Sequence, residues 1–287
     1  MAVAALTYCE YRPPVSLVGV VECFWRRERW QPPARDLGVL PDGRMDLAWG
    51  GDGEVRVMGP QQRALGRPFS ADVVVVGVRF APGVGPALLG VPGHELADLH
   101  PSLAALDSRP AAALARDLKT IEDPADVPVA MTRAIERRIR SSFSPDPLVA
   151  RASALLAWPG ARVEGVAAEL ALSRRHLERR FRELVGYGPK TLQRVLRFQR
   201  LLVALGPEDA PALAQIAPAL GYADQPHLTR ETRALSGLSP AQLDSMLGAL
   251  AHAGAAGIFK TGTPTGAPVR WTRRSARPRR GTEPGTP

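Results

Sequence analysis

The chain has 287 residues, 45% of them hydrophobic, which is enough for two globular domains. No apolar run approaches membrane-spanning length and no signal peptide is recognisable, so we expect a cytoplasmic protein and exclude an integral membrane protein. The formal net charge of +9 favours a polyanionic partner.

Residues 1–105 contain short β-rich runs separated by Gly and Pro, which predicts a small β-sandwich or barrel. The expected strands are Val18–Trp25, Arg35–Leu40, Met45–Trp49, Glu54–Met58 and Val73–Phe80. The last of these runs is the strongest strand signal in the chain. Between the second and third runs, Pro-Asp-Gly at residues 41–43 is typical of a turn, and a hairpin corner and a binding role are equally compatible with it.

A candidate effector pocket in this half consists of aromatic and arginine side chains. Its members are Trp25, Arg44, Trp49, Arg79 and Phe80. The same residues would serve as core and rim of a purely structural domain, which is the commoner role. The two His and two Cys of this half lack the spacing of metal ligands, so we expect no metal, no cofactor and two reduced cysteines.

Residues 106–145 are predicted to be a helical connector. Val127, Met131, Ile135 and Ile139 recur every four residues and form one apolar stripe on a helix. This stripe would pack either on the β-rich domain or on a second subunit across a two-fold interface. The segment Ser141–Asp146 is the expected hinge.

A block of seven identities within residues 176–189 returns 51 positions later. Each copy has the order His-Leu-x-Arg-x-x-Arg-x-Leu-x-Gly-x-x-Pro, beginning at His176 in the first and at His227 in the second. A similar apolar segment precedes each copy. We interpret the repeat as one structural unit used twice.

The first copy has the start and stop signals of two consecutive helices. Val163–Leu170 has apolar residues at helical spacing, and Ser173 is placed to cap a second helix. Gly186 is placed to end that second helix, and Pro189 to begin the next one. Helix, short turn and helix in this order predict a helix-turn-helix unit.

The second helix of this unit has an apolar and a cationic side. Leu177, Phe181 and Leu184 fall on one stripe, which leaves Arg175 and Arg179 on the opposite side. A charged face is usually only a solvated face. Here it is cationic and duplicated, and residues 174–200 contain nine Lys and Arg against two Glu, which favours DNA.

Lys190–Leu205 is predicted to be one continuous helix between the two units. Sixteen residues rise about 24 Å. With the turns at its ends, this helix could hold two reading helices about 34 Å apart, which is one turn of B-DNA. The two units would then enter successive major grooves.

The run Gly-Tyr-Ala-Asp-Gln-Pro-His-Leu at residues 221–228 and the duplicated block resemble the DNA-binding domain of AraC-type transcriptional regulators, over residues 146–250. This family has two helix-turn-helix units joined by a long helix. The resemblance implies that bases are read by Arg175, Glu178, Arg179, Gln225, Thr229 and Arg230, whose side chains match the donors and acceptors of base edges. The expected phosphate contacts are Ser173, Arg174, Arg182, Lys190, Arg194 and Arg233.

The second copy departs from the family pattern at two positions. Pro218 lies inside its first helix, which we expect to be short or kinked. Thr232 stands where Phe181 anchors the first copy, which predicts a thinner core. We therefore expect the first unit to supply most of the affinity for DNA.

Residues 23–25, 40–47 and 77–83 resemble parts of the cupin-like domain that precedes AraC-type DNA-binding domains in some regulators. The expected fold class is therefore α+β, with a cupin-like domain at 1–105, the helical connector, and an all-α double helix-turn-helix domain. Beyond residue 250, Gly, Thr, Pro and Arg dominate, which predicts a disordered basic tail at 251–287. The tail would either attract DNA in a salt-sensitive way or be an inert, solubilising segment.

These observations predict a non-enzymatic, sequence-specific DNA-binding regulator, modulated by a ligand or by dimerisation through the N-terminal domain. Double-stranded DNA is the expected partner, and RNA polymerase, a small-molecule effector and a second copy of the chain are further candidates. Two alternatives stay open. One is an architectural protein that binds DNA without sequence preference, and the other is a cupin-like enzyme domain with a reactive cysteine, fused to a DNA-targeting module.

Overall fold

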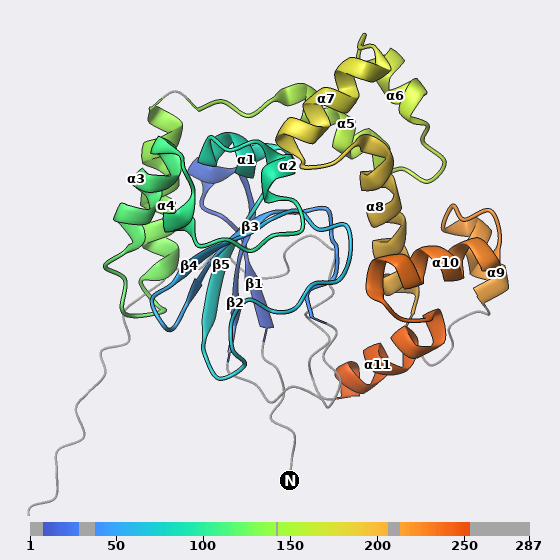
Figure 1. Ribbon diagram of the computed structural model, residues 1–287, viewed down its shortest axis with the longest axis horizontal. Helices are drawn as coiled ribbons and strands as arrows, with labels where there is room; N and C mark the ends of the chain where they lie inside the picture. Colours follow the sequence, from blue (N-terminus) through green and yellow to red (C-terminus); the bar gives the residue numbers. More distant parts are fainter. Residues whose placement is uncertain (1–7, 29–37, 142, 206–212, 253–287) are drawn as a thin grey trace, which may run out of the picture.

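The computed structural model describes residues 8–28, 38–141, 143–205 and 213–252 (Figure 1). An antiparallel five-stranded sheet is followed by a helical C-terminal region, which confirms the α+β class. The strands are β1 (Tyr8–Tyr11), β2 (Val21–Arg27), β3 (Asp46–Gly50), β4 (Val55–Met58) and β5 (Val75–Phe80). Their order in the sheet is β1-β2-β5-β3-β4.

Four of the expected strands are present, with bounds shifted by up to three residues. Strand β1 was not predicted. The expected strand Arg35–Leu40 lies partly outside the described residues, and Val39 forms only an isolated bridge with Leu65. The strands of the described segments form one sheet, and helices instead of a second sheet cover one of its faces.

The two faces of the sheet have different contents because successive side chains of a strand point to opposite sides. One face carries the larger of two apolar cores of this domain, which includes Leu47, Trp49 and Phe80. On β5, Val76 and Val78 are fully buried in this larger core, whereas Val75 and Arg79 face the other side. Helices α1 (Val84–Leu89), α3 (Arg109–Leu118) and α4 (Val127–Arg140) pack on the larger core (Figure 1). The short helical elements of this domain are η1 (Val15–Leu17), α1 (Val84–Leu89), α2 (Gly93–Leu96), η2 (Leu103–Ala105), α3 (Arg109–Leu118) and α4 (Val127–Arg140).

The apolar stripe of α4 packs on the sheet of its own chain. Val127, Met131 and Ile135 are 0% exposed and belong to the larger core. Of the two partners that the periodicity allowed for this stripe, the β-rich domain and a second subunit, the structure shows the β-rich domain. Phe143, in the segment expected to be a hinge, is also buried in this core, so α3 and α4 are part of the N-terminal domain and not a free connector.

The C-terminal region contains two helix-turn-helix units joined by α8 (Figure 1). Its helices are α5 (Pro147–Leu156), α6 (Val163–Glu169), α7 (Arg174–Leu184), α8 (Pro189–Ala204), α9 (Leu213–Ala219), α10 (Gln225–Ser236) and α11 (Pro240–His252). The Ser173 side chain accepts a hydrogen bond from the His176 amide, which confirms the predicted cap of α7. Gly186 follows α7 with φ of +97°, and Pro189 is the first residue of α8, as expected.

The second unit repeats these caps. The Asp224 side chain accepts from the His227 amide at 2.6 Å, and Gly237 ends α10 with φ of +74°. Pro218 does not shorten α9 at its end, because α9 ends at Ala219, the equivalent of the last residue of α6. Thr232 is fully buried, and its hydroxyl donates to the Leu228 carbonyl at 2.8 Å, so the smaller residue satisfies its own polar group. The predicted tail at 251–287 lies almost entirely outside the described residues.

Candidate nucleic-acid interface

The cationic side of α7 faces solvent. Leu177 and Phe181 are 0% exposed and hold the helix in the core of the first unit. The four arginines on the outer side are exposed. They are Arg174, Arg175, Arg179 and Arg182. A row of exposed guanidinium groups on a recognition helix is suited to both base edges and phosphates.

The outer side of α10 is also exposed but carries fewer charges. Gln225, Arg230 and Arg233 are exposed, and Thr229 is half-buried. Lys190, at the start of α8, is exposed as well. The structure thus places most of the predicted contact residues on the outer surface of the two units.

Glu178 has a second environment besides the outer surface of α7. Its carboxylate lies close to Gly188, the N-cap residue of α8, where a Cβ atom would meet the end of this flexible side chain. A carboxylate at a helix N-terminus is favourable because the helix dipole is positive there. Glu178 therefore lies near the start of α8 as well as on α7.

Arg194 lies in an ion-pair cluster instead of standing alone. Its Nε atom is 3.1 Å from Glu231 of α10, and Arg197 binds the same carboxylate at 2.9 Å. The Arg197 guanidinium also lies 5.1 Å from the centre of the Tyr222 ring. Burial raises the pKa of Glu231, but hydrogen bonds and charge from Arg197 and Arg194 outweigh it and hold the pKa below its usual value. This cluster fixes α10 on α8, and phosphate binding by Arg194 would compete with it.

The equivalent position in the first unit carries the opposite charge. Arg180 corresponds to Glu231 in the repeat and pairs with Asp146, whose other oxygen caps α5 by accepting from the Leu148 amide. The first unit is thus fixed to a neighbouring helix by the positive charge of Arg180, and the second by the negative charge of Glu231. Sequence analysis missed both contacts, and the signal was the one charge reversal within an otherwise similar block.

Both units contact the N-terminal domain away from their outer surfaces. Gly186, which follows α7, packs against the backbone of Gly93 and the ring of Pro60. The amide of Ala64 donates to the Leu235 carbonyl of α10 at 2.7 Å. The exposed arginines of α7 and α10 therefore stay accessible while the ends of both helices are held by the sheet domain.

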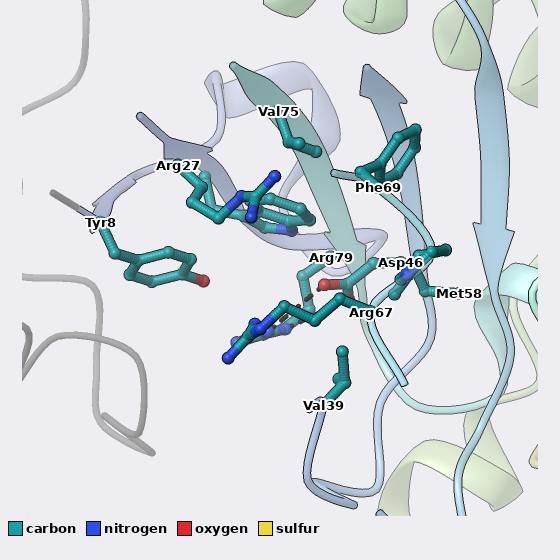
Figure 2. Close-up of a pocket in the computed structure, with 11 residues that line it drawn as sticks. Tyr8, Arg27, Val39, Asp46, Met58, Arg67, Phe69, Val75 and Arg79 are labelled. Carbon is teal, nitrogen blue, oxygen red and sulfur yellow. Dashed lines mark hydrogen bonds and ion pairs between the residues drawn. The ribbon is translucent and has the colours of Figure 1, made fainter. Parts of the chain in front are cut away.

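A cavity of about 110 Å³ lies on the side of the sheet away from the larger core (Figure 2). Its aromatic walls come from Tyr8, Trp25 and Phe69, and the first two rings stack with centroids 5.9 Å apart. Met58 and Val75 complete its apolar lining. Sequence analysis identified Trp25 but missed the other four residues, because the cavity forms only when separate strands and loops meet.

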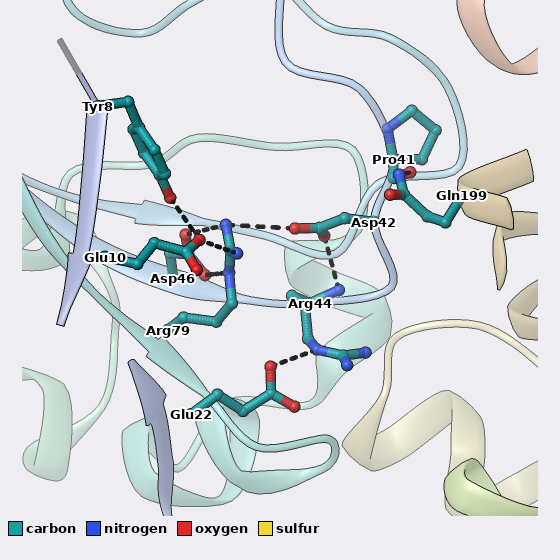
Figure 3. A network of polar contacts seen from close by, with 9 residues as sticks. All are labelled: Tyr8, Glu10, Glu22, Pro41, Asp42, Arg44, Asp46, Arg79 and Gln199. Atoms are coloured by element: carbon teal, nitrogen blue, oxygen red, sulfur yellow. Dashed lines mark hydrogen bonds and ion pairs between the residues drawn. The ribbon is translucent and has the colours of Figure 1, made fainter. Parts of the chain in front are cut away.

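Arg79 is the centre of a charged cluster at this cavity (Figure 3). It binds Asp46 at 3.2 Å and Glu10 at 3.2 Å on the sheet, and Asp42 at 3.4 Å on the adjacent turn. Burial raises the pKa of Asp46 to about 6, although the Arg79 guanidinium acts in the opposite direction. One guanidinium is thus shared by three carboxylates.

The other predicted pocket residues lie elsewhere. Trp49 and Phe80 are 1% exposed and belong to the larger core on the opposite face of the sheet, because each is one residue out of register with the cavity lining. Arg44 pairs with Glu22 at 2.6 Å and does not line the cavity. The pocket prediction is therefore corrected to Trp25 and Arg79.

The structure also shows the surroundings of the possible metal ligands and of the Cys23 thiol. Within them, no group of three His, Cys, Asp or Glu is placed to hold a metal ion. Cys23 is 2% exposed, and burial raises the pKa of its thiol far above the usual value, which disfavours a reactive thiolate. Among the same residues, every helix is too short or too polar to cross a membrane.

Comparison with known proteins divides the chain into two matched parts. Residues 9–102 match a family described as a domain of unknown function, DUF6597, and residues 166–246 match a family described as a helix-turn-helix domain. No curated protein matches the chain.

Solved structures show distant likeness. The C-terminal domain of AraT, a response regulator from Geobacillus stearothermophilus, is 24% identical over 35% of this chain and 86% of its own, with a TM-score of 0.32. ToxT from Vibrio cholerae O395 is 11% identical over 85% of this chain and 98% of its own, with a TM-score of 0.41.

The matched family and the two capped units joined by α8 define the class of the C-terminal region. Residues 166–246 belong to a helix-turn-helix domain. A helix-turn-helix domain is a DNA-binding fold, which makes DNA the candidate partner of this region.

Proposed function

We propose that the protein binds a specific promoter element by placing α7 and α10 in two successive major grooves. The observation that supports this most is that both helices expose their polar side while their apolar side is fixed to the same α8 helix. Arg175 and Arg179 would read bases in one groove, and Gln225, Thr229 and Arg230 in the other. Arg174, Arg182, Lys190 and Arg233 would contact phosphates, with Ser173 at the helix start.

The two recognition helices are compared by Arg179→Ala and Arg230→Ala in separate titrations on the promoter site. We expect Arg179→Ala to weaken binding by about 1–3 kcal/mol, and Arg230→Ala to weaken it less, because α7 carries more exposed cations. Arg151→Ala is the control, since this exposed arginine lies on α5 and pairs with Glu169. A larger loss for Arg230→Ala would reverse the proposed ranking of the two units.

Sequence-specific binding is distinguished from architectural binding by competition. At moderate salt, we expect a large excess of unrelated DNA to leave the promoter complex intact, because specific sites bind about 10³-fold or more tighter than random sequence. Equal displacement by promoter DNA and by unrelated DNA would support the architectural alternative. Genome-wide mapping of bound sites would then supply the operator.

We also propose that the cavity beside Trp25 and Arg79 holds a small effector. Its aromatic walls suit an aromatic molecule, and its volume of about 110 Å³ is below the roughly 150 Å³ of a cavity that holds benzene, so the occupant has one small ring at most. Benzene is a suitable first probe. We expect it to raise the melting temperature of the wild type and not of Met58→Trp, which fills the cavity; equal shifts in both proteins would argue against this site.

A further inference from the structure

Residues 39–44 contact both the cavity and α8. Figure 3 shows Pro41 of this segment beside Gln199 of α8, and Asp42 beside Arg79. Val39 lines the cavity. The next residue, Leu40, is 6% exposed and is buried in the same apolar cluster as Val195 and Phe198 of α8. Neighbouring residues of one short segment therefore have their contacts in different domains.

The turn that follows sits directly on α8. The buried side chain of Gln199 donates to the Pro41 carbonyl at 2.5 Å. Gly43 has φ of +80°, and a Cβ atom there would lie 3.0 Å from Leu192. A Cβ atom at residue 43 would crowd the Leu192 side chain, and the positive φ strains residues other than glycine, so this contact favours glycine with the observed turn geometry.

Asp42 connects this turn to the cavity. One of its carboxylate oxygens accepts from the Arg44 amide at 2.8 Å and shapes the turn, and the other lies 3.4 Å from Arg79. Arg79 is held from the sheet side by Asp46 and Glu10. The Arg79 guanidinium therefore connects the cavity lining to the turn at residues 41–43, which packs on α8.

Tyr187 shows how closely the two domains meet here. It lies between α7 and α8, is 4% exposed, and its hydroxyl has no hydrogen-bond partner among the described residues. Burial raises the pKa of Tyr187, and the nearby carboxylate of Asp42 acts in the same direction. The Asp42 carboxylate is therefore near enough to act electrostatically on a hydroxyl that is buried between α7 and α8.

We propose that Arg79 and Asp42 are positioning residues that couple the cavity to α8 through the turn at residues 39–44. An occupant that binds Arg79 in place of Asp42, or displaces Val39, moves the turn and thereby loosens or shifts α8. Because α8 spaces the two units, cavity occupancy alters how α7 and α10 are presented to DNA. This inference rests on the proposed function for its consequence, and the coupling itself is measurable without DNA.

The test is hydrogen–deuterium exchange of α8 in the full chain carrying Asp42→Asn. This substitution keeps the shape of the side chain and its capacity to accept from Arg44, but removes the charge that Arg79 binds. We expect exchange in α8 to become roughly three- to fivefold faster, as for loss of a partly buried ion pair, with β5 and α4 unchanged. Asp52→Asn is the matched control, since this exposed carboxylate caps only the nearby 50–54 turn.

A second variant keeps the proposal testable if Asp42→Asn folds poorly. Gln199→Met removes the hydrogen bond to Pro41 from the α8 side, and it is expected to accelerate α8 exchange in the same way. In the double variant the combined effect should be smaller than the product of the single effects, because both changes release the same turn. Independent, multiplicative effects would contradict a shared element.

The cavity end of the coupling is tested by Met58→Trp, which places a larger side chain toward the cavity. We expect it to change α8 exchange in the wild-type background and to have no further effect with Asp42→Asn. Unchanged α8 exchange in Asp42→Asn, Gln199→Met and Met58→Trp overturns the coupling even when promoter binding is intact. Absence of specific promoter binding by the wild type would instead contradict the proposed function, while the exchange results still decide the coupling.

Discussion

At the scale of single residues, equivalent positions of the two units carry opposite charges, Arg180 and Glu231. Each unit is therefore held by different ion pairs to a different neighbouring helix. Arg180 in the first unit binds Asp146, and Glu231 in the second binds Arg194 and Arg197. These ion pairs lie on the inner sides of α7 and α10, so they hold the helices without using the outer, exposed arginines. Helix positioning and the proposed DNA contacts therefore belong to different residues of the same helix.

The Glu231 ion pairs predict a measurable loss of stability. Glu231→Gln is expected to lower the free energy of unfolding at pH 7 by about 1–3 kcal/mol, because the charge-assisted hydrogen bonds to two arginines are removed. The pKa of Glu231 is depressed, so its contribution is present above the ordinary value of 4.5 and is lost as pH falls through the folded-state value. Urea unfolding checks this against Glu169→Gln, whose exposed pair with Arg151 should contribute little.

Asp46 should give the opposite pH dependence. Its folded-state pKa is raised from 3.8 to about 6, so the folded protein binds the proton more tightly, and stability falls as pH rises through this window. Relative to Asp46→Asn, the wild type should lose about 1 kcal/mol of unfolding free energy between pH 5 and pH 7.5. A wild type that gains stability over the same range would mean that pairing with Arg79 dominates over burial.

At the scale of helices and turns, the two copies of the repeat allow equivalent glycines to be compared in different surroundings. Gly186 and Gly237 end equivalent helices and both have positive φ, but only Gly186 packs against Gly93 and Pro60; a Cβ atom at Gly237 would meet nothing within 4 Å. Both copies thus need a glycine for its positive φ, but only in the first copy does this glycine also contact the N-terminal domain.

Gly186→Ala is therefore predicted to be more harmful than Gly237→Ala. The strain of positive φ should cost about 1 kcal/mol at either position. Overpacking against Gly93 and Pro60 should add about 1–3 kcal/mol at Gly186 alone. Thermal unfolding of the two variants measures the difference, and equal losses would show that packing against the N-terminal domain contributes little.

At the scale of the whole molecule, the sheet domain touches the inner ends of both recognition helices and the side of α8. A change in the N-terminal domain therefore has a direct physical route to the DNA-binding domain, through Gly93 with Gly186, Ala64 with Leu235, and Pro41 with Gln199. The arginines on the outer sides of α7 and α10 stay exposed.

The basic segment beyond residue 257 leads to a prediction from composition alone. Residues 260–287 contain seven Lys and Arg and one Glu, so deletion of 258–287 should weaken promoter binding in low salt. The dependence of log K on log salt should become shallower by roughly 0.9 for each phosphate that the shortened chain no longer neutralises. A full-length chain with its tail arginines changed to Gln separates charge from length, and unchanged low-salt affinity in both proteins would assign the tail no role in binding.

The helix-turn-helix units were readable from sequence because their determinants are local. Ser173, Asp224, Gly186 and Gly237 act within one turn of the helices they cap, and the spacing of Leu177 and Phe181 already specifies the buried side. The cavity was readable only in part. Trp25 and Arg79 line it, whereas Trp49 and Phe80 have the core role that the sequence also allowed, since adjacent strand positions face opposite sides of the sheet and differ only by register.

The sequence by itself determined the duplicated units, the long helix between them and the cationic character of the recognition surface, because periodicity, caps and charge are properties of neighbouring residues. Tertiary structure alone decided that the α4 stripe packs on its own sheet, that three carboxylates share Arg79, and that residues 39–44 seat α8. These interactions join residues far apart in the chain, and their energies depend on burial and register, which no local pattern encodes.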